Sequence, residues 1–260
     1  MVPDSAACHS CRSPQQGIPA IAMAFQPIVH LPSREIYAYE ALVRGPQGQP
    51  AAWVFEQISP EGHYHFDQLC RVTAIRAAAR LGLHKHGTTR LSINFLPNAV
   101  YEPKACIRVT LAAAMRTGFP VNRIIFEFTE AEAMDSHHIL NILRSYRAMG
   151  FKTAIDDFGA GYSGLGLLSQ FQPDIVKLDM ALIRDIDTDK VKRTIVRNTL
   201  CMLRDLDIEP VCEGIETLAE HDVLRDFGVS LMQGYLLARP EVEALPAIRE
   251  RSSESVPRRA

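Results

Sequence analysis

The sequence lacks the features that would place it in a membrane or on a nucleic acid. No apolar stretch approaches the roughly 20 residues that a membrane helix needs, and the first residues carry no charged-then-apolar secretory pattern. The formal net charge is only -2, and no basic run is long enough to follow a phosphate backbone. We therefore expect a cytoplasmic protein that binds neither a membrane nor polymeric nucleic acid, and for which a small anion remains a candidate ligand.

Cysteine is too sparse to form a disulfide framework. The six cysteines are neither dense nor regularly spaced. Four of them lie in apolar or helical surroundings and are expected to be small core residues: Cys70, Cys106, Cys201 and Cys212.

The other two cysteines form a lone C-x-x-C motif. Cys8 and Cys11 lie in a leader rich in Pro, Ser and Gln. A zinc site needs about four ligands, and the nearest further donors are His9, His63 and His65. An inert or reducible tail is therefore the favoured interpretation, and a metal site is the alternative.

Length and composition fit one globular domain. The chain has 260 residues, of which 47% are hydrophobic and 22% charged, as is ordinary for an α/β barrel. We expect a flexible leader over residues 1–20, one domain over 21–250 and a disordered tail over 251–260. One helix is expected after Pro240.

Short apolar runs alternate with longer amphipathic stretches along the domain. Two of these stretches repeat apolar residues at helical spacing, with Leu69, Val72, Ile75 and Ala79 in one and Val191, Ile195, Met202 and Leu206 in the other. The expected strands are residues 24–29, 35–43, 91–94, 124–128, 153–156, 175–178, 210–213 and 230–232.

This alternation predicts a barrel. Strands separated by helices need crossover connections, so they form a mostly parallel sheet, and a set of this size closes most economically into a barrel. The first two strands are separated only by residues 30–34, too few for a crossover helix, and should pair as an antiparallel hairpin.

Polar residues close most of these apolar runs. In a barrel the C-terminal ends of the strands surround one cavity, so these side chains should meet there. Helix capping is the alternative, but Glu40, Glu127 and Glu213 are poor caps, and an unpaired buried carboxylate costs several kcal/mol. The set comprises Glu40, Asn94, Glu127, Asp156, Asp157, Lys177, Asp179, Glu213 and Gln233.

These side chains suit hard divalent cations. Carboxylate and amide oxygens bind Mg²⁺ or Mn²⁺, with Ca²⁺ as a non-productive substitute. The adjacent Asp156 and Asp157 could hold two ions, and such a pair polarises a phosphoryl oxygen and generates hydroxide for in-line attack. Lys177 would orient the attacking water or stabilise the phosphate, with nearby cations lowering its pKa; a solvated strand end is the alternative. The glycine-rich segment 157–164 would approach an anion or act as a lid, unless it is a plain connection.

Over about residues 25–240 the chain resembles the EAL domain, a family of bacterial cyclic di-GMP phosphodiesterases. The resemblance rests on ordered motifs: F-Q-P-I-V at 25–29, E-A-L-V-R at 40–44, F-E-F-T-E at 126–130, D-D-F-G-A-G-Y-S at 156–163, K-L-D at 177–179, E-G-I-E at 213–216 and Q-G-Y at 233–235. It implies a modified TIM (β/α)8 barrel with an antiparallel first strand, commonly found as a homodimer.

The resemblance also implies roles for individual residues. Lys177 matches the catalytic lysine, Gln26 and Arg44 match substrate contacts, and Asp179 and Gln233 match residues that line the metal and water cluster. Glu130 and Glu216 match positions that order the glycine-rich loop. The implied ligands of two Mg²⁺ or Mn²⁺ ions are Glu40, Asn94, Glu127, Asp156, Asp157 and Glu213.

The expected activity is hydrolysis of cyclic di-GMP to linear 5'-pGpG. Gly164 and Ala160 depart from common family residues without removing a ligand, so no metal carboxylate is missing. The alternatives are a receptor that binds cyclic di-GMP without cutting it and a hydrolase of another phosphodiester. The sequence carries no diguanylate cyclase motif and no recognisable sensor domain.

Overall fold

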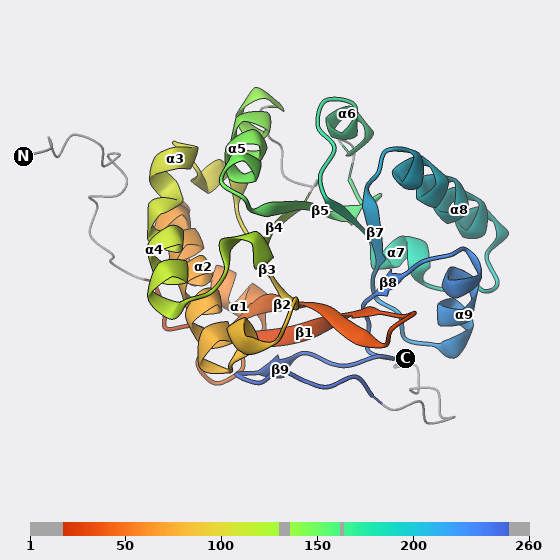
Figure 1. The fold of residues 1–260 in the computed structure, drawn as a ribbon, viewed down its shortest axis with the longest axis horizontal. Helices are drawn as coiled ribbons and strands as arrows, with labels where there is room; N and C mark the ends of the chain where they lie inside the picture. The colour runs from red at the N-terminus through yellow and green to blue at the C-terminus, as the bar shows by residue number, and fades with distance from the viewer. Residues whose placement is uncertain (1–17, 130–135, 162–163, 250–260) are drawn as a thin grey trace, which may run out of the picture.

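The chain folds into a closed barrel of eight strands surrounded by helices (Figure 1). The computed structural model describes residues 18–129, 136–161 and 164–249. Most of the expected leader, all of the expected tail and both leader cysteines lie outside these ranges. The strands are β1 (Ala22–His30), β2 (Glu35–Arg44), β3 (Arg90–Asn94), β4 (Ile124–Thr129), β5 (Lys152–Phe158), β6 (Ile175–Leu178), β7 (Glu209–Cys212), β8 (Leu231–Met232) and the short β9 (Glu241–Val242).

The antiparallel hairpin expected at the start of the barrel is confirmed. β1 pairs antiparallel with β2, with Ala22 opposite Arg44, and also pairs antiparallel with β8. Every pairing from β2 through β8 is parallel. β1 therefore closes the barrel as its one reversed strand, and the modified TIM barrel is the observed fold.

Helices cover the outside of the barrel (Figure 1). Among the described residues none is both long and apolar enough to cross a membrane. The helices are α1 (Ala51–Phe55), α2 (His63–Arg80), α3 (Pro103–Cys106), α4 (Arg108–Thr117), α5 (Ser136–Ala148), α6 (Gly164–Leu168), α7 (Met180–Ile183), α8 (Lys190–Asp205) and α9 (Leu218–Asp226). Single 3₁₀ turns lie at Pro60–Gly62, Leu83–Lys85, Pro97–Ala99 and Val121–Arg123.

The prediction of which face of α8 packs against the barrel is wrong. Val196, Leu200 and Leu203 face the barrel, whereas Val191 is 67% exposed and Ile195 is 45% exposed. Both sets recur at helical spacing, so periodicity alone could not select the face that packs.

The segment after Pro240 was also predicted incorrectly. It forms β9, which pairs antiparallel with β1, and no helix follows it up to residue 249. Its backbone bonds to the barrel instead, because Tyr39 Oη donates a 2.9 Å hydrogen bond to the carbonyl of Pro246.

The cysteine expectation holds only in part. Cys106 and Cys212 are buried core residues, Cys70 is half-buried, and Cys201 is exposed on α8.

A floor of apolar side chains fills the barrel near the N-terminal ends of its parallel strands. Strand side chains alternate between the two faces of a sheet, so the residue two positions further along points into the same interior. This alternation places the polar residues of the sequence above the floor. The floor consists of Ile28, Ala38, Ile125, Ala154, Ile175, Val211 and Leu231.

Candidate metal and phosphodiester site

The polar residues above the floor form one buried cluster. Glu40 follows Ala38 by two positions in β2, and Lys177 follows Ile175 by two positions in β6. The same step leads from floor residues to Glu127, Asp156, Glu213 and Gln233, and Asn94 ends β3 opposite Glu127. The prediction that these side chains meet at one end of the barrel is confirmed by their contacts.

Lys177 lies at the centre of the cluster. Its ammonium group is 2.6 Å from Glu213 Oε1 and 2.9 Å from Glu127 Oε2. Asp156 Oδ1 lies at 3.1 Å and Glu40 Oε2 at 3.3 Å. The side chain is 1% exposed, so the alternative of a solvated strand end is wrong.

The carboxylates form two groups that share one residue. Glu40, Glu127 and Asp156 offer oxygens within 4.8 Å of one another, and so do Asp156, Asp157 and Glu213. Asp156 therefore belongs to both groups. The donors are all carboxylate oxygens, which are the ligands that Mg²⁺ and Mn²⁺ prefer, so this buried cluster is suited to divalent cations.

Two amides hold Glu40 in place. Asn94 Nδ2 donates to Glu40 Oε1 at 3.0 Å, and Gln233 Nε2 donates to Glu40 Oε2 at 2.8 Å. Burial raises the pKa of Glu40, but Lys177 and the two amides outweigh burial and lower it. The carbonyl oxygen of Gln233 is buried and has no hydrogen-bond partner among the described residues.

The other carboxyl groups are held less favourably as anions. Burial raises the pKa of Glu127 to about 8, although Lys177 opposes the shift. Burial, with the neighbouring Asp156 charge, raises the pKa of Asp157 to about 6. Burial also raises the pKa of Asp156 and Glu213. The positive charge of Lys177 does not balance the negative charge of all these carboxylates, so the cluster favours the binding of further cations or protons.

The pKa of Lys177 is set by burial and by the four surrounding carboxylates, and its expected lowering by nearby cations stays a prediction. Burial lowers it, but Asp156, Glu127, Glu213 and Glu40 together raise it well above its usual value. The ammonium form is therefore strongly favoured by these neighbours.

The backbone at the end of β5 turns sharply. Asp157 has a positive φ of 53°, and its N–H donates to Asp156 Oδ1 at 3.0 Å. Gly159 follows with φ 99°, where a β-carbon would clash with Leu182. This turn begins the glycine-rich segment, of which residues 162–163 lie outside the described ranges, and its role as a lid stays a prediction.

A cavity of about 440 Å³ opens over the cluster. Gln26 and Asp179 also line it. Asp179 has a structural role as well, because its carboxylate accepts from the N–H of Ala181 and caps α7. Gln26 Nε2 donates to the carbonyl of Ala238 at 3.1 Å, which joins β1 to the C-terminal segment.

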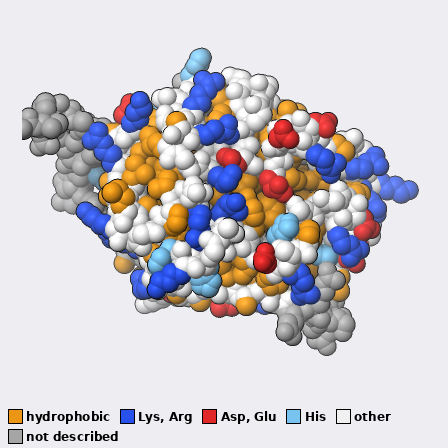
Figure 2. All heavy atoms as spheres, viewed as in Figure 1, with side chains coloured by type: hydrophobic (Ala, Val, Ile, Leu, Met, Phe, Trp, Pro, Cys, Tyr) orange, Lys and Arg blue, Asp and Glu red, His pale blue; other side chains and the backbone are white. Residues whose placement is uncertain are grey.

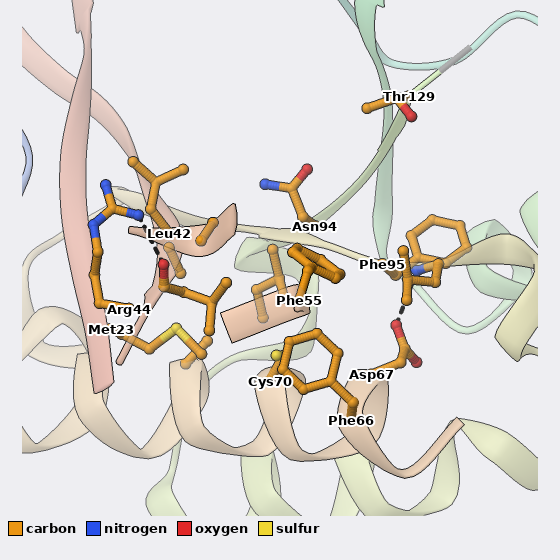
Figure 3. A pocket seen from close by; sticks show the side chains of 16 residues that line it. Met23, Leu42, Arg44, Phe55, Phe66, Asp67, Cys70, Asn94, Phe95 and Thr129 are labelled. Carbon is orange, nitrogen blue, oxygen red and sulfur yellow. Dashed lines mark hydrogen bonds between the residues drawn. The ribbon is translucent and has the colours of Figure 1, made fainter. Parts of the chain in front are cut away.

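A second cavity of about 390 Å³ lies beside the first and is mainly apolar (Figure 3). Leu42 lines both cavities. Arg44 lies at this second cavity, where its guanidinium donates to the carbonyl of Val43 at 2.7 Å. Arg44 is thus adjacent to the carboxylate cavity but does not line it.

Glu216 lines the first cavity and forms an ion pair with Arg184 at 2.8 Å. The buried Glu220, which the sequence reasoning missed, accepts the N–H groups of Glu216 and Thr217 at 3.0 Å each. Glu220 thereby orders the loop after β7, and the capping box that it forms with Thr217 is the sequence signal that could have found it. Glu130 lies outside the described residues.

Ser92 is a second residue that the sequence reasoning missed. It is fully buried in β3 at the level of the apolar floor, and its hydroxyl bonds to Glu127 Oε1. The signal was its position two residues before Asn94, which places both side chains in the barrel interior.

The molecular surface contrasts with this interior. On the face shown in Figure 2, basic and acidic side chains are interspersed with hydrophobic ones.

Solved structures of known proteins are similar to this chain in fold and in sequence. A standalone versatile EAL protein from Vibrio cholerae O395, solved in its c-di-GMP bound form, is 52% identical with a TM-score of 0.85, over 91% of this chain and 98% of that one. Klebsiella pneumoniae BlrP1, in a manganese and cyclic diGMP complex at pH 6, is 36% identical with a TM-score of 0.83, over 88% of this chain and 57% of that one.

Curated relatives are longer than this chain. The blue light- and temperature-regulated antirepressor BluF of Escherichia coli is 31% identical over 226 residues, which are 86% of this chain and 55% of BluF. The bifunctional diguanylate cyclase/cyclic di-GMP phosphodiesterase MucR of Pseudomonas aeruginosa is 30% identical, over 85% of this chain and 33% of MucR. The chain thus spans about half or less of their length. Residues 15–240 match the sequence profile of the EAL domain, and the chain belongs to the EAL domain family.

Proposed function

We propose that this protein hydrolyses cyclic di-GMP to linear 5'-pGpG with the help of two divalent metal ions. The observation that carries the proposal is that two clusters of three carboxylates each have Asp156 in common. Relatives named as cyclic di-GMP phosphodiesterases and structures solved with this nucleotide support it.

The residues fit a pair of Mg²⁺ or Mn²⁺ ions. Glu40, Glu127 and Asp156 would hold one ion, with the amide oxygen of Asn94 after rotation of its side chain, while Asp156, Asp157 and Glu213 would hold the other. When bound, the ions would polarise the phosphoryl oxygen and lower the pKa of a water molecule for in-line attack.

The protein groups around the ions have separate tasks in this proposal. Lys177 would stabilise negative charge on the phosphate or orient the attacking water. The unpaired oxygen of Gln233 would accept a hydrogen bond from that water, because the amide nitrogen is already committed to Glu40.

The two adjoining cavities suit a ligand with a phosphate ring and two bases. The scissile phosphate would lie in the carboxylate cavity, and one base would extend past Leu42 into the apolar cavity beside Arg44. The Arg44 guanidinium would contact the second phosphate or that base.

A receptor that binds cyclic di-GMP without cutting it is the second candidate. It is favoured by the name of one relative, BluF, which is called an antirepressor. The complete carboxylate set favours the enzyme, since a receptor has no need of every metal ligand.

We also propose that the protein forms a homodimer through α8. Val191 and Ile195 are exposed apolar residues one helical turn apart on this helix, and the exposed Leu206 follows its last residue. Burying these side chains against a second copy would remove them from water.

The proposal is tested by incubating the purified protein with cyclic di-GMP and Mg²⁺, with an EDTA control. Loss of cyclic di-GMP with Mg²⁺ but not with EDTA supports the enzyme. Calorimetric binding of the nucleotide with no loss after prolonged incubation would support the receptor instead.

A further inference from the structure

Lys177 is the cation that holds the carboxylate cluster together. Its ammonium group lies 2.6 to 3.3 Å from oxygens of Glu40, Glu127, Asp156 and Glu213. No other lysine or arginine among the described residues forms an ion pair with these four carboxylates.

Burial makes this arrangement strongly dependent on Lys177. Glu127 is 1% exposed and Glu40 is 6% exposed, and carboxylates so far from water repel one another unless a cation lies between them. The four carboxylates come from β2, β4, β5 and the residue after β7. Lys177 thus ties together strands on several sides of the barrel.

The same positive charge must oppose a metal ion. Asp156 and Glu213 would be ligands of the divalent ions, and both already contact the Lys177 ammonium group. An ammonium group a few ångströms from a divalent cation in a buried site repels it strongly.

We propose that Lys177 is an internal counter-ion, which keeps the barrel folded before metal binds and weakens metal binding as a consequence. The metal half of this inference rests on the proposed function, whereas the folding half rests on the ion pairs alone. It gives the protein a stable metal-depleted state and makes its metal occupancy respond to the free metal concentration.

The test substitutes Lys177→Met, which removes the charge and keeps much of the side-chain length. The matched control is Lys152→Met. Lys152 is the first residue of β5, away from the cluster, and its ammonium group forms an ion pair with Asp174 at 2.9 Å. For each protein, calorimetry measures Mg²⁺ and Mn²⁺ affinity without nucleotide, and thermal unfolding is followed in EDTA and in saturating metal.

We expect Lys177→Met to bind metal at least tenfold more tightly than the wild type. Its Tm in EDTA should fall by about 10 °C, because a buried ion-pair centre is lost, and metal should restore most of the fall. Lys152→Met should change the Tm equally with and without metal, and its metal affinity should match that of the wild type.

Other results separate the two proposals. The inference is overturned if the wild type binds metal and Lys177→Met binds it no more tightly. It is also overturned if the Tm of Lys177→Met falls by the same amount in EDTA and in metal. If the wild type binds no metal, the proposed metal-dependent function fails, and a Tm of Lys177→Met in EDTA equal to that of the wild type would overturn the folding half as well.

Should Lys177→Met not fold in EDTA, a second variant keeps the test decisive. Lys177→Met combined with Glu213→Gln removes one charge of each sign, so it should recover folding without metal. Failure of both variants to fold in the presence of either metal would contradict the counter-ion role.

Discussion

Gln233 and Glu40 are joined by a 2.8 Å hydrogen bond, although 192 residues separate them along the chain and antiparallel β1 lies between their strands. This bond fixes one oxygen of a carboxylate that we assign to the first metal ion. A partner that orients a ligand in this way typically contributes 10- to about 100-fold in metal affinity.

We therefore predict that Gln233→Ala weakens metal binding by about 10- to 100-fold. The fold should persist, since only one side-chain bond is lost. Calorimetric titration with Mn²⁺ measures the effect, and the control is Gln170→Ala, an exposed residue just after α6 whose side chain bonds to the carbonyl of Gly166. Equal Mn²⁺ affinity in the wild type, Gln233→Ala and Gln170→Ala would show that Gln233 does not support metal binding.

Asp156→Asn should abolish hydrolysis while the barrel stays folded. Asp156 belongs to both carboxylate groups, so its loss disturbs both proposed ions. We expect at least a thousandfold fall in kcat, of the order seen when a main electrostatic group is removed. Glu40→Ala should act in the same direction. Activity and melting temperature are measured on the same samples, and substantial turnover by a folded, metal-loaded variant would contradict the ligand assignment.

Ca²⁺ should bind the site and permit nucleotide binding without supporting cleavage. It is larger than Mg²⁺ and accepts looser coordination, so it would not hold the reacting groups in line. Calorimetry with Ca²⁺ and cyclic di-GMP, run beside an activity assay, checks both halves. Equal turnover in Ca²⁺ and Mg²⁺ would argue against this account.

The stability of the protein in EDTA should fall as pH rises from about 5 to 8. The pKa of Glu127 is raised from 4.5 to about 8 and that of Asp157 from 3.8 to about 6. The folded state therefore keeps protons that the unfolded state has released, so the free energy of unfolding decreases through this range, by an amount on the order of a few kcal/mol.

Glu40 does not reverse this trend, because its lowered pKa acts below 4.5. Urea unfolding at several pH values measures the slope, and saturating metal should flatten it because metal ions compete with the protons. A stability in EDTA that does not fall between pH 5 and pH 8 would show that the folded state keeps no extra protons on these carboxyl groups.

Ile195→Glu should convert a dimer into a monomer. Ile195 is 45% exposed on α8, whereas Val109 is 49% exposed on α4 and provides a control site of similar exposure. Light scattering after size-exclusion chromatography gives the mass of each variant. A dimer that survives Ile195→Glu, or a wild type that is monomeric, would exclude α8 as the interface.

Much of the barrel could be predicted because its strands carry a two-residue period. Ile125 and Glu127, or Ile175 and Lys177, place an apolar floor residue and a polar site residue on the same interior face. This alternation explains why the polar ends of separate runs could be expected to converge.

Other features depend on contacts that no local pattern records. The segment after Pro240 forms β9 because β1 offers it an edge to pair with, and the apolar residues of α8 include two competing faces. Ser92 was missed because its position two residues before Asn94 predicts an interior side chain but not the partner of its hydroxyl, which only the position of Glu127 supplies.

The most direct test of the proposed function is the product formed from cyclic di-GMP in Mg²⁺ and water enriched in ¹⁸O. The account predicts linear pGpG with one ¹⁸O in its 5'-phosphate, at a rate that EDTA and Asp156→Asn both suppress. Recovery of unchanged cyclic di-GMP from a metal-loaded, folded protein would contradict it.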